Sequence, residues 1–201
     1  MATKQGVHAN SFSMSDKVKI IEQEEIRPRS AKIISGVIEG MVLLMALVLA
    51  LLIRTTWLET AVVISGSMKP TLPIDARLLV DHREALHGHW KRNDIVIFRD
   101  PPHWPKDVYV KRIIAVPGDV VQLIDGQVFI NGEALSEPYL AERPHPENYG
   151  PWKMGPEQYF MMGDNRNDSE DSRDHGPVLD SDIHGRATFQ LWPMSGFGKL
   201  H

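Results

Sequence analysis

Residues 108–133 read VYVKRIIAVPGDVVQLIDGQVFINGE, and this stretch decides the fold. Short runs rich in valine and isoleucine are separated in it by the dipeptides Pro117-Gly118, Asp125-Gly126 and Asn131-Gly132. β-Branched residues favour strands, and Asp-Gly suits the two-residue turn of a hairpin. The stretch therefore predicts consecutive short strands with a tight hairpin at Asp125-Gly126.

Similar short apolar runs continue on both sides of this stretch. Strands are expected at 61–64, 76–80, 94–99, 108–116, 120–124, 128–130, 158–162 and 187–192. Strands at this spacing are typical of an antiparallel β sandwich or a partly closed barrel, so the predicted class is mainly β. Residues 138–156 are rich in proline, glycine and histidine, and they predict an irregular loop.

Residues 33–53 form a long apolar run, IISGVIEGMVLLMALVLALLI, in which Glu39 is the only charged residue. About 20 apolar residues at a rise of about 1.5 Å each are enough to span a bilayer core. The run is longer than the apolar core of a removable signal peptide, so a retained transmembrane helix is favoured. Glu39 lies near the N-terminal end of the run, where a structural role is favoured over a functional one.

Basic residues are distributed unequally around this run. Lys17, Lys19, Arg27, Arg29 and Lys32 precede it closely, whereas Arg54 is alone after it until Lys69. Basic residues mark the cytoplasmic side of a membrane helix. The sequence therefore predicts a polar, disordered cytoplasmic arm at 1–32, a transmembrane helix at 33–53 and an extracytoplasmic β-rich domain at 54–201.

Composition excludes several functional classes. The formal net charge of -4 argues against binding to nucleic acid. Because there are no cysteines, a disulfide scaffold, a thiol nucleophile and thiolate metal sites are excluded. His82, His87 and His89 lie in a polar connector without a carboxylate pattern, and residues 164–174 match a calcium loop only superficially. Neither a metal nor a cofactor is expected.

The candidate nucleophile follows the apolar run, in the sequence Ser65-Gly66-Ser67-Met68-Lys69-Pro70-Thr71-Leu72. Gly66 allows the backbone to approach a substrate closely, and Pro70 stiffens the exit from the turn. Taken alone, Ser-Gly-Ser is more often a plain turn. A nucleophilic serine needs a base within hydrogen-bond reach, so the rest of the chain decides between the two interpretations.

Histidine and lysine are the two candidate bases. The histidines after the apolar run allow a Ser-His-Asp triad, but none lies in a recognisable setting such as a Gly-x-Ser-x-Gly elbow. Lys111 lies in a predicted strand and shares a face with Tyr109 and Ile113. If that face is buried, the pKa of the amine falls by several units from about 10.4, which leaves free amine near neutral pH. The alternative is an edge-strand lysine that prevents aggregation.

Four blocks of sequence occur in a specific order after the apolar run. They are SGSMKPTL at 65–72, DIVIF at 94–98, VKR at 110–112 followed by PGD at 117–119, and GDNR at 163–166 followed by DSR at 171–173. Together with ING at 130–132, they resemble the bacterial type I signal peptidases, a family with a serine-lysine dyad. Ile64 departs from the family pattern, in which proline is frequent at this position.

The resemblance implies a membrane-anchored serine endopeptidase that removes N-terminal signal peptides from exported preproteins. It implies that Ser67 is the nucleophile and Lys111 the general base. The Ser65 hydroxyl and the Ser67 backbone N–H would bind the oxyanion of the tetrahedral intermediate. A donor of this kind typically lowers the barrier by about 3 kcal/mol.

The resemblance also implies supporting residues near the dyad. Ser169 would hydrogen-bond the lysine amine, Asp171 and Arg173 would form an ion pair, and Asp164 would help to hold its loop. Asp168 and Glu170 add negative charge near the lysine, and their side chains are expected to face solvent. Because Met68 and Leu72 flank the nucleophile, we expect them to form the walls of shallow apolar substrate pockets.

The implied partners are preprotein signal peptides, the lipid bilayer and the secretion translocon, and the implied location is the bacterial inner membrane. One alternative is a serine-lysine protease that processes a dedicated partner or itself, like the self-cleaving repressors. Those proteins carry a DNA-binding domain and lack an N-terminal anchor. The other alternative is a non-catalytic, membrane-tethered β domain, which needs no lysine facing Ser67.

Overall fold

The computed structural model describes residues 29–83, 85, 88, 90–99 and 101–200. The chain divides into two compact units, Met1–Leu51 and Leu52–His201, and each is described by itself. Residues 1–28 of the expected arm, together with His87 and His89, lie outside the described residues.

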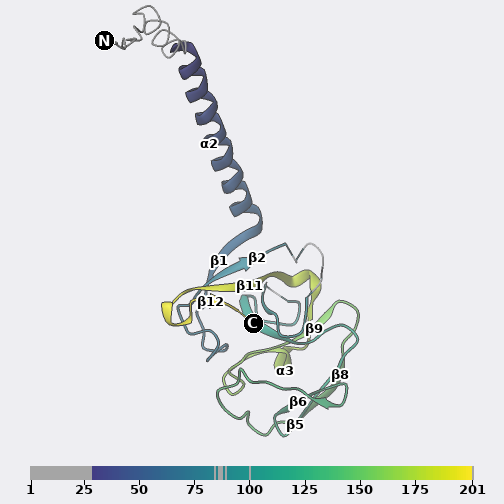
Figure 1. The fold of residues 1–201 in the computed structure, drawn as a ribbon. Helices are drawn as coiled ribbons and strands as arrows, with labels where there is room; N and C mark the ends of the chain where they lie inside the picture. The colour runs from purple at the N-terminus through teal and green to yellow at the C-terminus, as the bar shows by residue number, and fades with distance from the viewer. Residues whose placement is uncertain (1–28, 84, 86–87, 89, 100, 201) are drawn as a thin grey trace, which may run out of the picture. The chain divides into compact units, whose positions relative to one another are not determined.

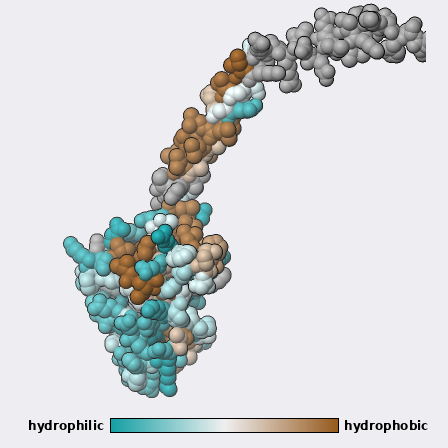
Figure 2. All heavy atoms as spheres, turned by 90° about the vertical axis from the view of Figure 1, so that its left-hand side faces the viewer, coloured by the Kyte–Doolittle hydropathy of each residue, from teal (hydrophilic) through white to brown (hydrophobic). Residues whose placement is uncertain are grey.

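The first unit contains most of α2 (Arg29–Trp57). Its apolar span, Ile33–Leu52, has a mean hydropathy of 2.4, and among the described residues it is the one helix long and apolar enough to cross a membrane. Figure 2 shows apolar atoms along most of its length. Glu39 accepts a 2.9 Å hydrogen bond from Ser35 Oγ one turn earlier, so its carboxylate is partly satisfied within the helix. The predicted N-terminal apolar helix is therefore present.

The second unit is built from two antiparallel sheets (Figure 1). The larger sheet has eight strands in the order β1 (Leu58–Val62), β2 (Arg77–Asp81), β11 (Ile183–Trp192), β3 (Ile95–Arg99), β4 (Val108–Ala115), β9 (Gln158–Met162) and β10 (Val178–Leu179), with β12 (Gly198–Lys199) paired to β11. The smaller sheet has the order β7 (Glu133–Ala134), β6 (Gln127–Ile130), β5 (Val120–Ile124) and β8 (Tyr149–Lys153). The short helices are α3 (Ser172–His175), η2 (Asp180–Asp182) and η3 (Met194–Gly196). The predicted mainly β class is confirmed, and the sheets are not closed into a barrel.

The hairpin predicted at Asp125-Gly126 joins β5 to β6. Ile124 pairs with Gln127, so the loop has two residues. Both of these residues have positive φ, 50° for Asp125 and 78° for Gly126, as a type I′ turn requires. The turn chemistry therefore fixes the register of this pair of strands.

The prediction of an irregular loop at 138–156 is wrong in part, because β8 lies within it and pairs with β5. Gly150 and Pro151 interrupt the strand pattern in the sequence. A proline is tolerated there because β8 lies at the edge of its sheet, where a missing N–H need not break a ladder hydrogen bond.

Alternate residues of β4 and β9 face two different core clusters. Ile113 and Met161 belong to a cluster with Phe98 and Trp104, whereas Ile114 and Phe160 belong to one that includes the smaller sheet. Both strands are therefore buried on two faces over this part. A third cluster lies beneath the turn that contains Ser67; its buried members are Val63, Met68, Leu72, Ala76, Leu78, Ile95 and Ala187. β4 is buried from Lys111 to Ala115, and this packing fixes the position of Lys111.

Candidate active site

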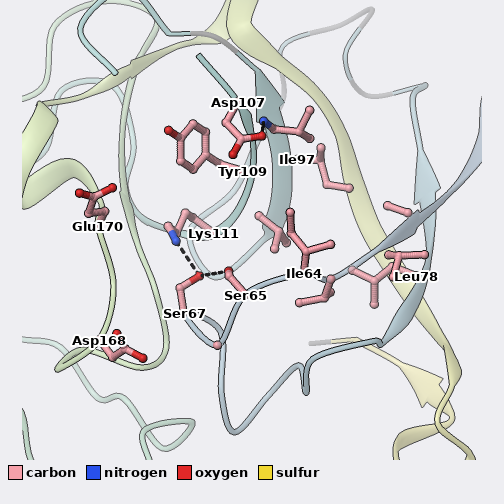
Figure 3. Close-up of a pocket in the computed structure, with 16 residues that line it drawn as sticks. Ile64, Ser65, Ser67, Leu78, Ile97, Asp107, Tyr109, Lys111, Asp168 and Glu170 are labelled. Carbon is pink, nitrogen blue, oxygen red and sulfur yellow. Dashed lines mark hydrogen bonds between the residues drawn. The ribbon is translucent and has the colours of Figure 1, made fainter. Parts of the chain in front are cut away.

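The Ser67 hydroxyl and the Lys111 amine meet in the second unit. Ser67 lies in the turns that connect β1 to β2, and Lys111 lies in β4. Lys111 Nζ donates a 2.7 Å hydrogen bond to Ser67 Oγ (Figure 3). Both residues are buried, with 4% of Lys111 and 7% of Ser67 exposed. The serine therefore has a nitrogen base within the distance that proton transfer requires.

Burial lowers the pKa of Lys111 to about 8, because the charged ammonium loses hydration. The negative charges of Asp171 and Glu170 oppose this shift, with a smaller effect of the same sign from Asp164, whereas Arg173 adds to the lowering. At such a pKa, about one tenth of the amine is neutral at pH 7 and about half at pH 8. The desolvation predicted for this strand face is therefore present, and it is the largest cause of the lowered pKa.

A second hydroxyl lies beside the first. Ser65 Oγ is 3.2 Å from Ser67 Oγ, so the two side chains of the Ser-Gly-Ser turn point to the same place. Ser65 is exposed, and a hydroxyl can rotate to donate to whichever acceptor is nearest. It can therefore turn from Ser67 toward a bound substrate.

These groups lie at the floor of a cleft of about 310 Å³. The cleft is lined by residues 61–67 and 107–111, together with Leu78, Ile97, Asp168 and Glu170. Figure 3 shows Asp168 and Glu170 on one side of the dyad and Ile64 and Leu78 on the other. Asp168 and Glu170 are exposed, as expected, although Glu170 still acts on the pKa of the amine.

The loop at 163–166 holds the backbone of the Ser67 turn. Asn165 N donates to Ser67 O at 2.9 Å, and Asn165 Nδ2 donates to Gly66 O at 3.2 Å. A Cβ on Gly163 would lie 2.4 Å from Ser67 O, so only glycine fits this close approach. No role was predicted for Gly163 or Asn165 from sequence, although both lie in the block GDNR at 163–166.

Asp164 is held by a buried ion pair. Its Oδ1 accepts from Arg112 Nε at 2.9 Å, and its Oδ2 accepts from Arg112 Nη2 at 2.7 Å. Thr71, from the Ser67 turn, donates to the same carboxylate. The expected role of Asp164 in holding its loop is consistent with these bonds, whereas its partner Arg112 was not foreseen.

Asp171 and Arg173 form the expected ion pair in a bidentate arrangement. Arg173 Nε donates to Asp171 Oδ1 at 2.9 Å, and Nη2 donates to Oδ2 at 3.0 Å. Asp171 also caps α3 and accepts from Gly163 N at 3.1 Å. The pair therefore ties α3 to the loop that supports Ser67.

Ser169 does not make the expected hydrogen bond to the lysine amine. Its hydroxyl donates to Asp171 Oδ2 at 2.9 Å instead, because the bend before α3 brings the two side chains together. Ser169 also packs on Gly163, whose added Cβ would lie 2.3 Å from Ser169 Oγ. In this arrangement Ser169 acts on the site through Asp171 and the close packing at Gly163.

Known proteins are similar in sequence to this chain over most of its length. A family model described as signal peptidase, peptidase S26, matches residues 37–192. The chain is 39% identical over 166 residues to a probable signal peptidase I-2 of Synechocystis sp., covering 80% of this chain and 75% of that protein. It is 38% identical over 178 residues to signal peptidase I P of Bacillus subtilis subsp. natto, covering 82% and 94%. The chain belongs to the signal peptidase family, peptidase S26.

Membership in the signal peptidase family confirms the resemblance and the expected enzyme class, a serine endopeptidase of the signal peptidase I type. A crystal structure of a signal peptidase I from Enterococcus faecalis also matches, with a TM-score of 0.44 and 31% identity over 49% of this chain and 97% of that chain.

Met68 and Leu72 do not form substrate pockets in this signal peptidase. Both are fully buried in the third core cluster, and neither lines the cleft. The turn bends so that Leu72 N donates to Met68 O at 2.9 Å, and this directs both side chains into the domain. Their closeness to Ser67 in sequence reflects support beneath the turn.

Met68→Leu is therefore expected to lower the free energy of unfolding by less than about 1.5 kcal/mol, as volume-conserving core changes do. Because Met68 is absent from the cleft, the preference for residues at the cleavage site should stay the same. Ile64→Ala, on the cleft wall and 76% exposed, serves as the comparison. The test measures thermal unfolding and the cleavage of peptides that vary beside the scissile bond. If Met68→Leu changes which of these peptides are cleaved, Met68 does contact the substrate.

Proposed function

We propose that this signal peptidase cleaves N-terminal signal peptides from exported preproteins with a Ser67-Lys111 dyad. The observation that carries the proposal is the 2.7 Å hydrogen bond between Lys111 Nζ and Ser67 Oγ at the floor of the cleft. Both side chains are buried, and the pKa of the amine is lowered to about 8 by burial. A nucleophile and a base with these properties are what acyl transfer without a histidine requires.

In the proposed mechanism, neutral Lys111 takes the proton from Ser67 Oγ as this oxygen attacks the scissile carbonyl carbon. The oxyanion that forms accepts from the Ser67 N–H and from the Ser65 hydroxyl; among the described residues, the Ser67 N–H makes no other hydrogen bond. The Lys111 ammonium then gives its proton to the leaving amine, and the C–N bond breaks to leave an ester on Ser67. A water molecule deprotonated by Lys111 hydrolyses this ester.

The part of β4 that lines the cleft supports an extended substrate. β4 pairs with β3 over residues 108–112, but β9 pairs only with the part of β4 from Arg112 onward. The pairing of β4 with β9 therefore does not extend along residues 108–111, and this stretch lines the cleft. An extended peptide can add to such a stretch through backbone hydrogen bonds. A cleft of about 310 Å³ leaves room for small side chains.

We further propose that α2 anchors the enzyme in the bacterial inner membrane, with the N-terminal arm in the cytoplasm and the β domain outside. The apolar span of α2 and the basic residues before it support this orientation. The partners are then the bilayer, the signal peptide and the secretion translocon. Confinement to the membrane raises the effective concentration of a substrate whose apolar helix lies in the same bilayer.

The direct test is to incubate the full chain, in proteoliposomes, with a preprotein that has alanine at its cleavage site. Mass spectrometry is expected to detect one cut, immediately after the signal peptide. A preprotein with a bulky residue before the scissile bond is the control and should stay intact. Cleavage of the chain itself, with no cleavage of preproteins, would instead favour the self-processing alternative.

The pH dependence of cleavage should report the pKa of Lys111. Because the neutral amine is the base, kcat/KM is expected to rise with pH and to level off above about pH 8. The charge of Glu170 raises this pKa, so Glu170→Gln should lower it and move the rising limb to lower pH.

Asp168→Asn is the matched control for Glu170→Gln. Asp168 is an exposed carboxylate on the same cleft, but it is not among the groups that shift the pKa of Lys111. Its profile should therefore coincide with that of the wild type. A rising limb that stays in place in Glu170→Gln would argue against Lys111 as the titrating base.

A further inference from the structure

Two buried arginines hold the loop that supports Ser67. Arg112 donates to both oxygens of Asp164, at 2.9 and 2.7 Å. Arg166 Nε donates to Gly163 O at 3.0 Å. The loop at 163–166 is thus fixed by one side chain from β4 and by one of its own.

Both arginines meet a single tyrosine. The Cζ atom of Arg112 lies 4.1 Å from the centroid of the Tyr139 ring, and that of Arg166 lies 5.9 Å from it. Glu137 accepts from Tyr139 Oη at 2.9 Å and from both terminal nitrogens of Arg166, with the Nη1 bond at 3.1 Å. We call Glu137, Tyr139, Arg112 and Arg166 the Tyr139 clamp.

The clamp is a closed arrangement of charges with little access to water. The side chains of Arg112, Arg166 and Glu137 are each 5% exposed or less. A desolvated guanidinium group over an aromatic ring is a favourable contact. Burial, with the negative charge of Glu137, raises the pKa of the Tyr139 phenol, so the hydroxyl stays a hydrogen-bond donor. These contacts give the clamp one preferred geometry.

Glu137 and Tyr139 have no direct contact with the nucleophile and reach it through the two arginines and the loop. Neither Glu137 nor Tyr139 lines the cleft; both follow β7 of the smaller sheet. On the other side of the loop, Asn165 N bonds Ser67 O, and Gly163 packs against the same carbonyl. The same loop also holds the Gly66–Ser67 peptide group, because Asn165 Nδ2 donates to Gly66 O at 3.2 Å. A displacement of the loop therefore moves the Ser67 N–H, which faces the developing oxyanion in the proposed mechanism.

We propose that Glu137 and Tyr139 are positioning residues of this peptidase, which set the Ser67 backbone through Arg112, Arg166 and the loop at 163–166. The inference rests on the proposed Ser67-Lys111 function and adds to it two residues outside the cleft. They act on the geometry of the transition state, and they leave substrate binding and the protonation of Lys111 unchanged.

Tyr139→Leu in the full chain is the test. Loss of the ring removes the aromatic contact of both arginines and loosens their positions, and kcat for preprotein cleavage should fall by about 10- to 100-fold, because small misplacements of reacting groups are costly. KM should stay within about twofold, and the rising limb of the pH profile should not move. The separate variant Tyr139→Phe keeps the ring over Arg112, so its kcat should stay within about threefold of the wild-type value.

Tyr149→Leu is the matched control. Tyr149, in β8 of the smaller sheet, is half-buried like Tyr139, but its ring stacks on Trp152 and on neither arginine. It should lower the melting temperature and leave kcat unchanged. Equal losses of kcat in Tyr139→Leu and Tyr149→Leu would show that Tyr139 contributes only to the general stability of the domain. Unchanged kcat in Tyr139→Leu would overturn the proposal.

Hydrogen exchange separates the clamp from the proposed function. Amides at 65–69 and 163–167 should exchange faster in Tyr139→Leu and at the wild-type rate in Tyr149→Leu, whether or not the chain cleaves preproteins. If Tyr139→Leu does not fold, the isosteric Glu137→Gln has the same expected pattern with a several-fold smaller kcat. Unchanged exchange in these segments would refute the clamp, whereas absent cleavage by the wild type would refute only the function.

Discussion

Lys111→Met is expected to reduce kcat for preprotein cleavage by about 10⁴-fold, the upper end of what a general base contributes. Methionine has a similar length and an apolar chain, so it can fill the space beside Ser67 without a basic nitrogen. Ser67→Ala should lose at least as much activity, because it removes the attacking oxygen. Cleavage is measured in single-turnover experiments with a preprotein, so that slow residual rates are detected.

The double variant Ser67→Ala/Lys111→Met should be no slower than Ser67→Ala alone. Groups that act as one unit give strongly non-additive losses, and the residual rate then reflects only the other features of the site. Independent roles would predict losses that multiply. The double variant therefore tests whether the 2.7 Å contact is a working pair.

Stability provides a second readout for Lys111→Met. Burial of an amine with a lowered pKa opposes folding, so replacement by an apolar side chain should leave the melting temperature unchanged or raise it. Lys153→Met, at an exposed position on β8, should retain full activity and serves as the control. A Lys111→Met enzyme that remains folded and active would rule out the dyad.

The strands could be predicted where the local sequence carries a clear signal. The sequence predicts a strand correctly where a run of β-branched residues ends at turn residues, as at Asp125-Gly126. The positive φ values of these two residues confirm the hairpin. β8 was missed because Gly150 and Pro151 weaken the local signal, and only its edge position explains why they are tolerated. Local pattern predicts a strand, but pairing decides how much irregularity it can carry.

Side-chain direction was the weakest part of the sequence interpretation. Met68 and Leu72 lie close to Ser67 in the chain, yet the turn directs them into the core, away from the cleft. Ser169 was expected to bond Lys111, but its hydroxyl faces Asp171 instead. Which way a turn residue points depends on a few dihedral angles that neither composition nor spacing determines.

The ion pair between Arg112 and Asp164 was not predicted either. The two residues are separated by 52 residues in the sequence, and nothing local to either predicts the other. Their pairing depends on the alignment of β4 with β9, in which Arg112 lies opposite Met162, two residues before Asp164. The register thus brings together two blocks that the sequence shows only as separate motifs.

Arg112→Met is expected to lower the free energy of unfolding of the β domain by about 3–5 kcal/mol, because it leaves the Asp164 carboxylate buried without its charge partner. The side chains of Arg112 and Asp164 are 2% and 0% exposed, so water cannot replace the lost bonds without a rearrangement. The measurement is urea unfolding of the full chain in detergent, followed by tryptophan fluorescence.

Two further variants decide whether the unpaired charge is the cause. Arg92 forms an ion pair with Asp119, and its side chain is 34% exposed. Asp119 keeps its hydrogen bonds from Asn131 and Val116 when Arg92 is removed. Arg92→Met should therefore lower the free energy of unfolding by about 1 kcal/mol or less. Arg112→Met/Asp164→Leu removes both buried charges and should recover much of the stability lost in the single variant, because well-packed apolar pairs can replace buried ion pairs. A double variant as unstable as Arg112→Met would show that packing around the guanidinium group, including its stacking on Tyr139, supplies the stability.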